Sequence, residues 1–388
     1  MTLDPEHLKA RAREATRLDD FGSEPMDDGL RVYCAALRDE AGLNQAGLDA
    51  VEASIVATLS ERLRVEACLR ANPGILDQEL LPQIFVVGLP RTGSTALSQF
   101  LSEDPDARSI RRWEINALTP PPDVTVLEDP RLAATRAAFR KRDEAMPELK
   151  TMLPVEAEDP SEHGPLLGLT FRNLQLPTLY TVPTYTAWLL ASDMTPAYAY
   201  LAKVLKLLQW KTPGRHWNLK NPPDLFALSA IHAVFPDATL VWTHRDPAKA
   251  IPSVASLAST QRLTGVDSLD KVSFMQEMLQ FQFAGVERGL ADREAIGEEA
   301  FVDSTQADLA KDTIGVIRAL YGKIGFPFTP EYQAHLEARM HNRPRGQHGA
   351  HRYDQAEFGV TDDQIRAPFA AYLSRFSMGD APKLAVAS

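Results

Sequence analysis

A short segment, residues 88–95 (GLPRTGST), has the residue types of an anion-binding loop. Glycine lets the backbone turn its N–H groups toward a ligand, and a helix beginning beyond the loop adds the positive end of its dipole. Arg91 adds a guanidinium, and Ser94 and Thr95 add hydroxyl donors. A nucleoside triphosphatase carries lysine before the last hydroxyl residue, where this chain has Ser94, so hydrolysis of ATP or GTP is disfavoured. The alternative is a purely structural turn between a strand and a helix.

A second cluster follows the apolar run 239–244. Arg245 comes directly after this run, and Ser253 lies about two turns into a helix that is expected to start near Pro247. An arginine at a strand end and a serine on the following helix can bind one more phosphate together. Taken alone, this pair is a weak indication, because surface arginines and helical serines are common.

The elements around these clusters predict an α/β fold. Short apolar runs at 84–87, 216–220 and 239–244 indicate buried parallel strands, and helical patterns follow at 96–101, 224–234 and after Pro247. Residues 270–325 are expected to be largely helical. We predict a three-layer fold in which a parallel central sheet is flanked by helices on both faces. In such sheets sites form beyond the carboxyl ends of the strands, where the clusters at 88–95, 218–223 and 244–253 would meet.

The chain divides into two regions in this prediction. Residues 1–80 read as a helical N-terminal extension, and residues 81–388 as one α/β domain with a helical insertion around 125–215. The N-terminal region either covers a pocket or makes a homodimer contact, and the sequence does not decide between these roles.

Composition narrows the class of protein. The 388 residues carry a net charge of −11, which argues against binding to nucleic acid or to an anionic membrane. No apolar run approaches the ~18 residues of a membrane span, and the N-terminus lacks the apolar region of a secretory signal, so we expect a cytoplasmic protein. The two cysteines, Cys34 and Cys68, are expected to be reduced, and no metal-ligand spacing is evident.

Together, the two clusters resemble those of the PAPS-dependent sulfotransferases, which use 3′-phosphoadenosine 5′-phosphosulfate (PAPS) as sulfuryl donor. Residues 90–95 (PRTGST) are similar to the family's 5′-phosphosulfate loop, and the spacing from Arg245 to Ser253 is similar to its 3′-phosphate element. Segments 156–162, 220–223 and 235–238 look like the bacterial branch and like the tyrosylprotein and heparan-type members. The resemblance spans about 84–355 and implies a P-loop-type fold.

The resemblance also implies roles for single residues. Arg91 would hold the 5′-phosphate and the transferring sulfuryl group, and Lys220 would stabilise that group as the bond breaks. The 5′-phosphate would be held by Thr92, Gly93, Ser94 and Thr95, and the 3′-phosphate by Arg245 and Ser253. A C-terminal run, 345–349 (RGQHG), is similar to the family's last 3′-phosphate loop, which would add Arg345 and Gly346, with Arg352 as a substitute. No metal is implied.

The acceptor hydroxyl must lose its proton as it attacks sulfur, so a base is needed. The resemblance to the carboxylate-using members points to Glu114, at the end of an expected short strand over 108–114. The alternative role for Glu114 is a helix cap or an ion pair, and His163 and His216 are rival bases.

The sequence therefore predicts a sulfotransferase that moves a sulfuryl group from PAPS to a hydroxyl of a small-molecule acceptor. The products would be a sulfate ester and adenosine 3′,5′-bisphosphate. The alternatives are a P-loop small-molecule kinase, which the missing lysine disfavours, and a noncatalytic nucleotide-binding protein. A carbohydrate, a lipid alcohol, a phenol and a peptide tyrosine all fit as acceptors. Tyr180, Tyr185 and Trp188 are guesses at the lining of an apolar acceptor pocket.

Overall fold

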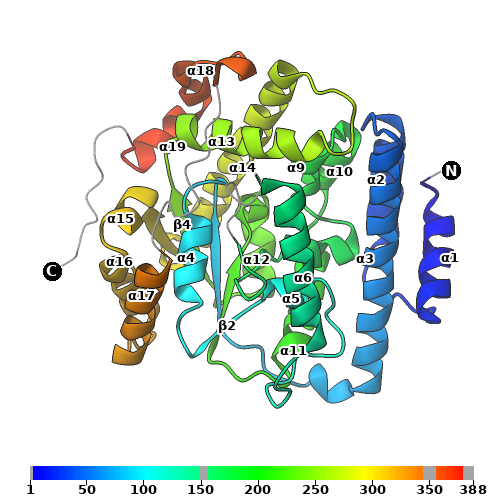
Figure 1. Cartoon of the computed structure of the whole chain (residues 1–388). Coiled ribbons are helices and arrows are strands. Elements are labelled where there is room, and N and C mark those ends of the chain that lie inside the picture. Colours follow the sequence, from blue (N-terminus) through cyan, green and yellow to red (C-terminus); the bar gives the residue numbers. More distant parts are fainter. Residues whose placement is uncertain (1–2, 148–154, 344–354, 379–388) are drawn as a thin grey trace.

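The computed structural model describes residues 3–147, 155–343 and 355–378 (Figure 1). Within these ranges, five strands form one parallel sheet in the order β2-β3-β1-β4-β5. The strands are β1 (Gln83–Gly88), β2 (Ala107–Ser109), β3 (His216–Lys220), β4 (Thr239–His244) and β5 (Phe301–Thr305). Because β1 lies between β3 and β4, the loop that follows it opens at the middle of the sheet edge.

Both faces of the sheet are buried, as the short apolar runs require. On β1, Ile84 and Val86 face one side and Phe85 and Val87 the other, since successive side chains of a strand point to opposite faces. Ile84 and Val86 pack in a cluster with α4 (Ser94–Leu101), α15 (Gln306–Lys311), α16 (Thr313–Ile324) and α17 (Pro330–Asn342). The opposite face packs against α11 (Thr195–Gln209), α12 (Leu228–Val234) and α14 (Lys271–Ile296). The result is the three-layer α/β arrangement that the sequence predicted.

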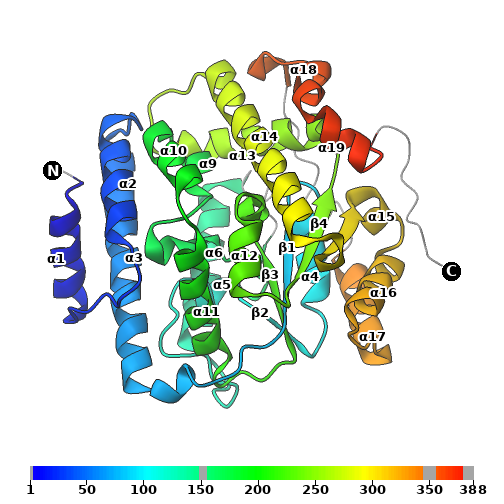
Figure 2. The same ribbon diagram turned by 180° about the vertical axis from the view of Figure 1, so that it is seen from behind.

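Three helices precede the first strand: α1 (Pro5–Thr16), α2 (Asp27–Asp39) and α3 (Gln45–Ala71). They stand side by side at one side of the molecule, opposite α15–α17 (Figures 1 and 2). Arg62 of α3 is fully buried and donates hydrogen bonds to the carbonyl oxygens of Phe21, Glu24 and Leu169. These bonds attach the N-terminal helices to the rest of the chain and satisfy a charge that would otherwise be costly to bury.

The connections between β2 and β3 are largely helical. They contain α5 (Arg112–Ile115), α6 (Pro130–Ala145), α8 (Gly164–Leu167), α9 (Leu176–Leu179), α10 (Pro183–Ala191) and α11. After β4 come α13 (Pro247–Arg262) and α14, and the described C-terminal part holds α18 (Asp362–Arg366) and α19 (Ala370–Arg375). No helix among the described residues is long and apolar enough to cross a membrane.

The region 270–325 is largely helical, as predicted, and it also contains a strand that the sequence did not predict: β5, which pairs with β4. One local expectation was wrong: the strand expected over 108–114 ends at Ser109, and Glu114 lies in the short helix α5. The backbone N–H of Arg111 donates to Glu114 Oε2 at 2.7 Å, so the carboxylate caps that helix from its third position.

Candidate active site

The loop between β1 and α4 has the backbone of an anion-binding turn. Gly93 has φ +93°, and Arg91 has φ +67°, a left-handed conformation that is uncommon for a residue with a side chain. Such strain gathers at functional sites, where the surrounding structure enforces it. At Gly88 a Cβ atom would lie 2.5 Å from the carbonyl oxygen of Thr243, so glycine is needed where the loop leaves the sheet beside β4.

Thr92 fastens this loop to the sheet. Its hydroxyl donates to the carbonyl oxygen of Leu89 at 2.7 Å and lies 2.6 Å from the hydroxyl of Thr243 on β4. The side chain is buried, so Thr92 can offer a ligand its backbone N–H group but not its hydroxyl. Ser94 and Thr95, at the start of α4, do line the adjoining cavity.

The two clusters that the sequence picked out lie together. Arg91 Nε donates to Ser253 Oγ at 3.2 Å, and Arg245 Nη1 donates to the carbonyl oxygen of Arg91 at 2.9 Å. Ser253 comes from α13, whose N-terminus starts two residues after Arg245. Two guanidinium groups and a hydroxyl therefore surround one edge of the loop, which is the charge arrangement that two phosphate groups need.

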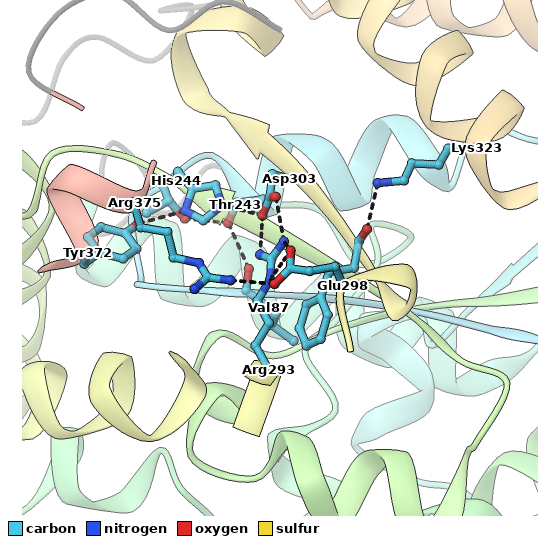
Figure 3. A network of polar contacts seen from close by, with 11 residues as sticks. Val87, Thr243, His244, Arg293, Glu298, Asp303, Lys323, Tyr372 and Arg375 are labelled. Atoms are coloured by element: carbon cyan, nitrogen blue, oxygen red, sulfur yellow. Dashed lines mark hydrogen bonds and ion pairs between the residues drawn. The ribbon is translucent and has the colours of Figure 1, made fainter. Parts of the chain in front are cut away.

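The end of β4 is held by a polar network from three further elements (Figure 3). His244 Nε2 lies 2.9 Å from Asp303 of β5, and His244 Nδ1 lies 3.0 Å from the hydroxyl of Tyr372 in α19. Arg293 of α14 donates to both carboxylate oxygens of Asp303. Burial lowers the pKa of His244, although the hydrogen bond to the Asp303 carboxylate and its charge act to raise that pKa. The backbone N–H of Arg245 also bonds to Tyr372, so α19 fixes the position of Arg245.

Lys220, at the carboxyl end of β3, is almost fully buried beside the loop. Its ammonium group donates to Glu162 Oε1 at 2.5 Å and to the Thr95 hydroxyl at 3.3 Å. Burial lowers the pKa of Lys220, and the attraction of Glu162 opposes that shift. An ammonium group has three donors, so one remains for a ligand oxygen.

A cavity of about 310 Å³, here the central cavity, opens in front of the loop. Its polar lining consists chiefly of Arg91, Ser94, Thr95, Arg112, Ser161, Glu162 and Gln175. Arg112 Nε is buried and has no hydrogen-bond partner among the described residues. Burial lowers the pKa of Arg112. An unpartnered guanidinium nitrogen beside Arg91 makes this cavity suited to an oxyanion.

Glu114 does not line the central cavity. Arg108 donates to its two carboxylate oxygens at 3.1 and 2.7 Å, and both side chains are buried. Glu114 thus makes both the cap and the ion pair that the sequence left as its alternative role, and this geometry gives no support to its expected role as base. The rival bases are also buried: His163 Nε2 lies 2.8 Å from a carboxylate oxygen of Asp224, and the ring of His216 packs in a tilted arrangement against Phe326.

Sequence reasoning missed two charged residues of the central cavity, Arg112 and Glu162. Glu162 lies in the segment 156–162, whose similarity to the sulfotransferases is the one signal for it in the sequence. The sequence could not single out Arg112, because its neighbour Arg111 is also an arginine. Only the turn into α5 decides which of the two side chains reaches the cavity. Arg345, Gly346 and Arg352 lie outside the described residues. Within the described ranges, no three His, Cys, Asp or Glu side chains gather as a metal site.

Comparison with known proteins identifies the family. A model of the sulfotransferase family matches residues 82–330. The chain belongs to the sulfotransferase family. Its sulfotransferase activity is the one that the sequence predicted, rather than the kinase alternative. No curated protein matches the chain.

Two solved sulfotransferases share the fold over nearly the whole chain. Sulfotransferase STF9 from Mycobacterium avium is 29% identical, with a TM-score of 0.88 and coverage of 96% of both chains. Sulfotransferase STF1 from Mycobacterium tuberculosis H37Rv is 27% identical, with a TM-score of 0.80 and coverage of 94% of this chain and 98% of that one. Because both matches include the region before β1, the N-terminal helices belong to the shared fold.

Proposed function

We propose that this sulfotransferase takes its sulfuryl group from PAPS and transfers it to a hydroxyl group of a small-molecule acceptor. The observation that carries the proposal is the contact of Arg91, Arg245 and Ser253 at one edge of an anion-binding loop. A donor with phosphate groups at both 3′ and 5′ positions needs two adjacent anion sites. The loop amides, Arg91, Ser94 and Thr95 hold the 5′ end, and Arg245 with Ser253 hold the 3′-phosphate.

The cationic residues stabilise the charge that develops during transfer. As the acceptor oxygen forms its bond to sulfur, the bond between sulfur and the bridging phosphate oxygen breaks, and negative charge grows on that oxygen. Lys220 donates its remaining N–H to this oxygen, and Arg112 donates its unpartnered Nε to a sulfuryl oxygen. Preorganised donors of this kind are typically worth about 10²–10³ in rate each.

We assign the base to Glu162 instead of Glu114. Glu162 lines the central cavity together with Arg91 and Thr95, and it holds Lys220, so one carboxylate faces both the acceptor and the leaving group. It takes the proton of the acceptor hydroxyl as the new bond to sulfur forms. Adenosine 3′,5′-bisphosphate leaves, and the product is a sulfate ester.

Calorimetry on the full chain tests the donor assignment. Adenosine 3′,5′-bisphosphate should bind tightly, and ADP or Mg²⁺-ATP much more weakly. Arg245→Ala should weaken binding of the bisphosphate far more than binding of ADP, whereas Lys249→Ala, an exposed change in the following helix α13, should weaken binding of neither. A preference for Mg²⁺-ATP, or an equal loss of affinity for both nucleotides in Arg245→Ala, would contradict the assignment of a 3′-phosphate site to Arg245 and Ser253. Bisphosphate binding without turnover on any acceptor would indicate a noncatalytic protein.

A further inference from the structure

A second cavity, here the side cavity, adjoins the central cavity and has a volume of about 370 Å³. Leu179 and Gln261 line both cavities, so the two cavities lie next to each other at these residues. The central cavity is the place where, in the proposed function, Glu162 meets the acceptor hydroxyl. A molecule with its hydroxyl there has the side cavity as the adjoining space for the rest of its body. Each volume lies within the range of small-molecule sites.

The lining of the side cavity is mainly apolar, with uncharged polar side chains at Thr181, Gln261, Thr264 and Ser268. Its larger side chains include Leu43, Met146, Tyr180, Val266 and Leu269. Among the described lining residues Arg262 has the one charged side chain, and its guanidinium is already used. It donates to both carboxylate oxygens of Glu277 and to the carbonyl oxygens of Pro177 and Thr178. A second charge entering this space would therefore lose its hydration without a partner.

The N-terminal helices supply one wall of this cavity. The α2–α3 connection contributes Ala41, Gly42 and Leu43, and the start of α3 contributes Gly47 and Ala50. Across from them, the turn after α13 contributes Gly265 and Val266. The backbone N–H of Asn44 donates to the carbonyl oxygen of Gly265 at 3.0 Å, and a Cβ on Gly47 would lie 2.2 Å from that oxygen. The wall is therefore a close backbone contact, in the region where α2 and α3 stand beside α9 and α10 (Figures 1 and 2).

We propose that the side cavity binds the hydrocarbon part of the acceptor, and that the acceptor is an uncharged alcohol or phenol carrying an alkyl or aryl tail. This inference rests on the proposed function for the position of the reacting hydroxyl. Among the acceptors that the sequence left open, it selects the apolar ones. A carbohydrate would find only the few hydroxyl and amide groups of Thr181, Gln261, Thr264 and Ser268 for its many hydroxyl groups, and a charged peptide would bring charges that the cavity does not match.

The test uses 4-methylphenol, 4-propylphenol and 4-hexylphenol as probes on the full chain. Their binding is measured by calorimetry with and without saturating adenosine 3′,5′-bisphosphate, and their kcat/KM is measured with PAPS. Burial of a methylene group favours binding by about fourfold, so the five added methylene groups would raise affinity about a thousandfold if all were buried, and we expect a rise of at least about thirtyfold from the methyl to the hexyl compound. A phenol whose 4-alkyl chain has a similar length but ends in a carboxylate, 6-(4-hydroxyphenyl)hexanoic acid, should bind at least about tenfold more weakly than 4-hexylphenol.

A matched pair of variants locates the effect. Val266→Asp places a carboxylate in the lining and should lower the affinity for 4-hexylphenol at least about tenfold, with little change for 4-methylphenol. Leu263→Asp lies three residues away, is 43% exposed and does not line the cavity, so it should change neither. Equal effects of the two variants, or affinities that do not depend on tail length, would overturn the inference.

Failure of the inference differs from failure of the proposed function. If adenosine 3′,5′-bisphosphate does not bind, the proposed donor site is wrong, but the alkylphenol series without nucleotide still tests the cavity. If the bisphosphate binds and sulfuryl transfer occurs with equal efficiency for all three tails, the donor site stands and the apolar acceptor site does not.

Discussion

The loop edge and the side cavity meet at the central cavity, but they are held by different kinds of contact. At the loop edge, Arg91, Ser253 and Arg245 are joined by hydrogen bonds, and the network of His244 and Asp303 fixes the strand end behind them. Around the side cavity, the walls are mainly apolar side chains and a contact between two glycine backbones. Directional bonds fix one ligand geometry, whereas apolar packing tolerates changes of shape. In the proposed function, the donor side thus fits one nucleotide, and the acceptor side can change its specificity with few substitutions.

The largest expected effect lies where the two regions meet. Glu162→Gln should lower kcat by about 10²–10⁴ because the base is lost, while the affinity for adenosine 3′,5′-bisphosphate changes little. Glu114→Gln is the matched control. It breaks a buried ion pair with Arg108, so it should lower the midpoint of thermal unfolding while the remaining folded enzyme keeps most of its kcat. Steady-state kinetics and thermal melts separate the two. Loss of kcat in Glu114→Gln at unchanged stability, with full kcat in Glu162→Gln, would return the role of base to Glu114.

A smaller effect is expected from the loop edge. Ser253→Ala removes the hydroxyl that Arg91 Nε contacts. It should lower the affinity for adenosine 3′,5′-bisphosphate by about tenfold, since hydrogen bonds to charged groups contribute about 1.5–3 kcal/mol. The affinity for 4-hexylphenol should stay the same. Ser256→Ala, three residues along the same helix, serves as control and should leave nucleotide affinity unchanged. If Ser253→Ala lowered the affinity for the alkylphenol as much as the affinity for the nucleotide, the loop edge and the side cavity would not bind their ligands independently.

Gly47→Ala should act on the opposite region. The added Cβ meets the carbonyl oxygen of Gly265, so α3 and the turn after α13 must move apart, at a cost of about 1–3 kcal/mol in the free energy of unfolding. The affinity for 4-hexylphenol should change, and that for the bisphosphate should not. Gly322→Ala in α16 is the control for adding a methyl group to a helical glycine, because nothing lies within 4 Å of its added Cβ and it does not line either cavity. Denaturant melts measure the stability change, and calorimetry measures the binding change. Unchanged alkylphenol binding in Gly47→Ala would contradict the assignment of α3 to the wall of the alkylphenol site.

The smallest effect concerns pH. Burial would raise the pKa of Asp303, but hydrogen bonds from His244 and Arg293 outweigh it and hold that pKa well below its usual range. The stabilisation that Asp303 gives is therefore present above its unfolded pKa of about 3.9 and is lost as the pH falls through the lower folded value. The stability difference between the wild type and Asp303→Asn should be constant from pH 8 to about pH 5 and narrow below that. A difference that narrows between pH 8 and pH 6 would contradict this assignment.

The parts of the site that the sequence predicted are those with a local signature. The strand, loop and helix from β1 to α4 are continuous in sequence, and Arg245 with Ser253 follow directly from β4, so their meeting follows from parallel strand order. The missed parts depend on tertiary placement. Glu162 reaches the cavity from an irregular segment, and β5 is a five-residue strand between helices whose partner, β4, is far away in sequence. Glu114 was placed at a strand end because the pattern could not distinguish an extended segment from a one-turn helix.

The central position of β1 has a consequence for how the chain folds. Arg91 and Ser253, which contact each other, are 162 residues apart in sequence. Contacts of such wide separation form late, because a long loop must be closed before they are made. During synthesis the proposed donor site can be completed only after β4 and α13 have left the ribosome. Since the bisphosphate would then bind only the finished fold, its binding should slow proteolysis across the whole sheet, not merely at the loop.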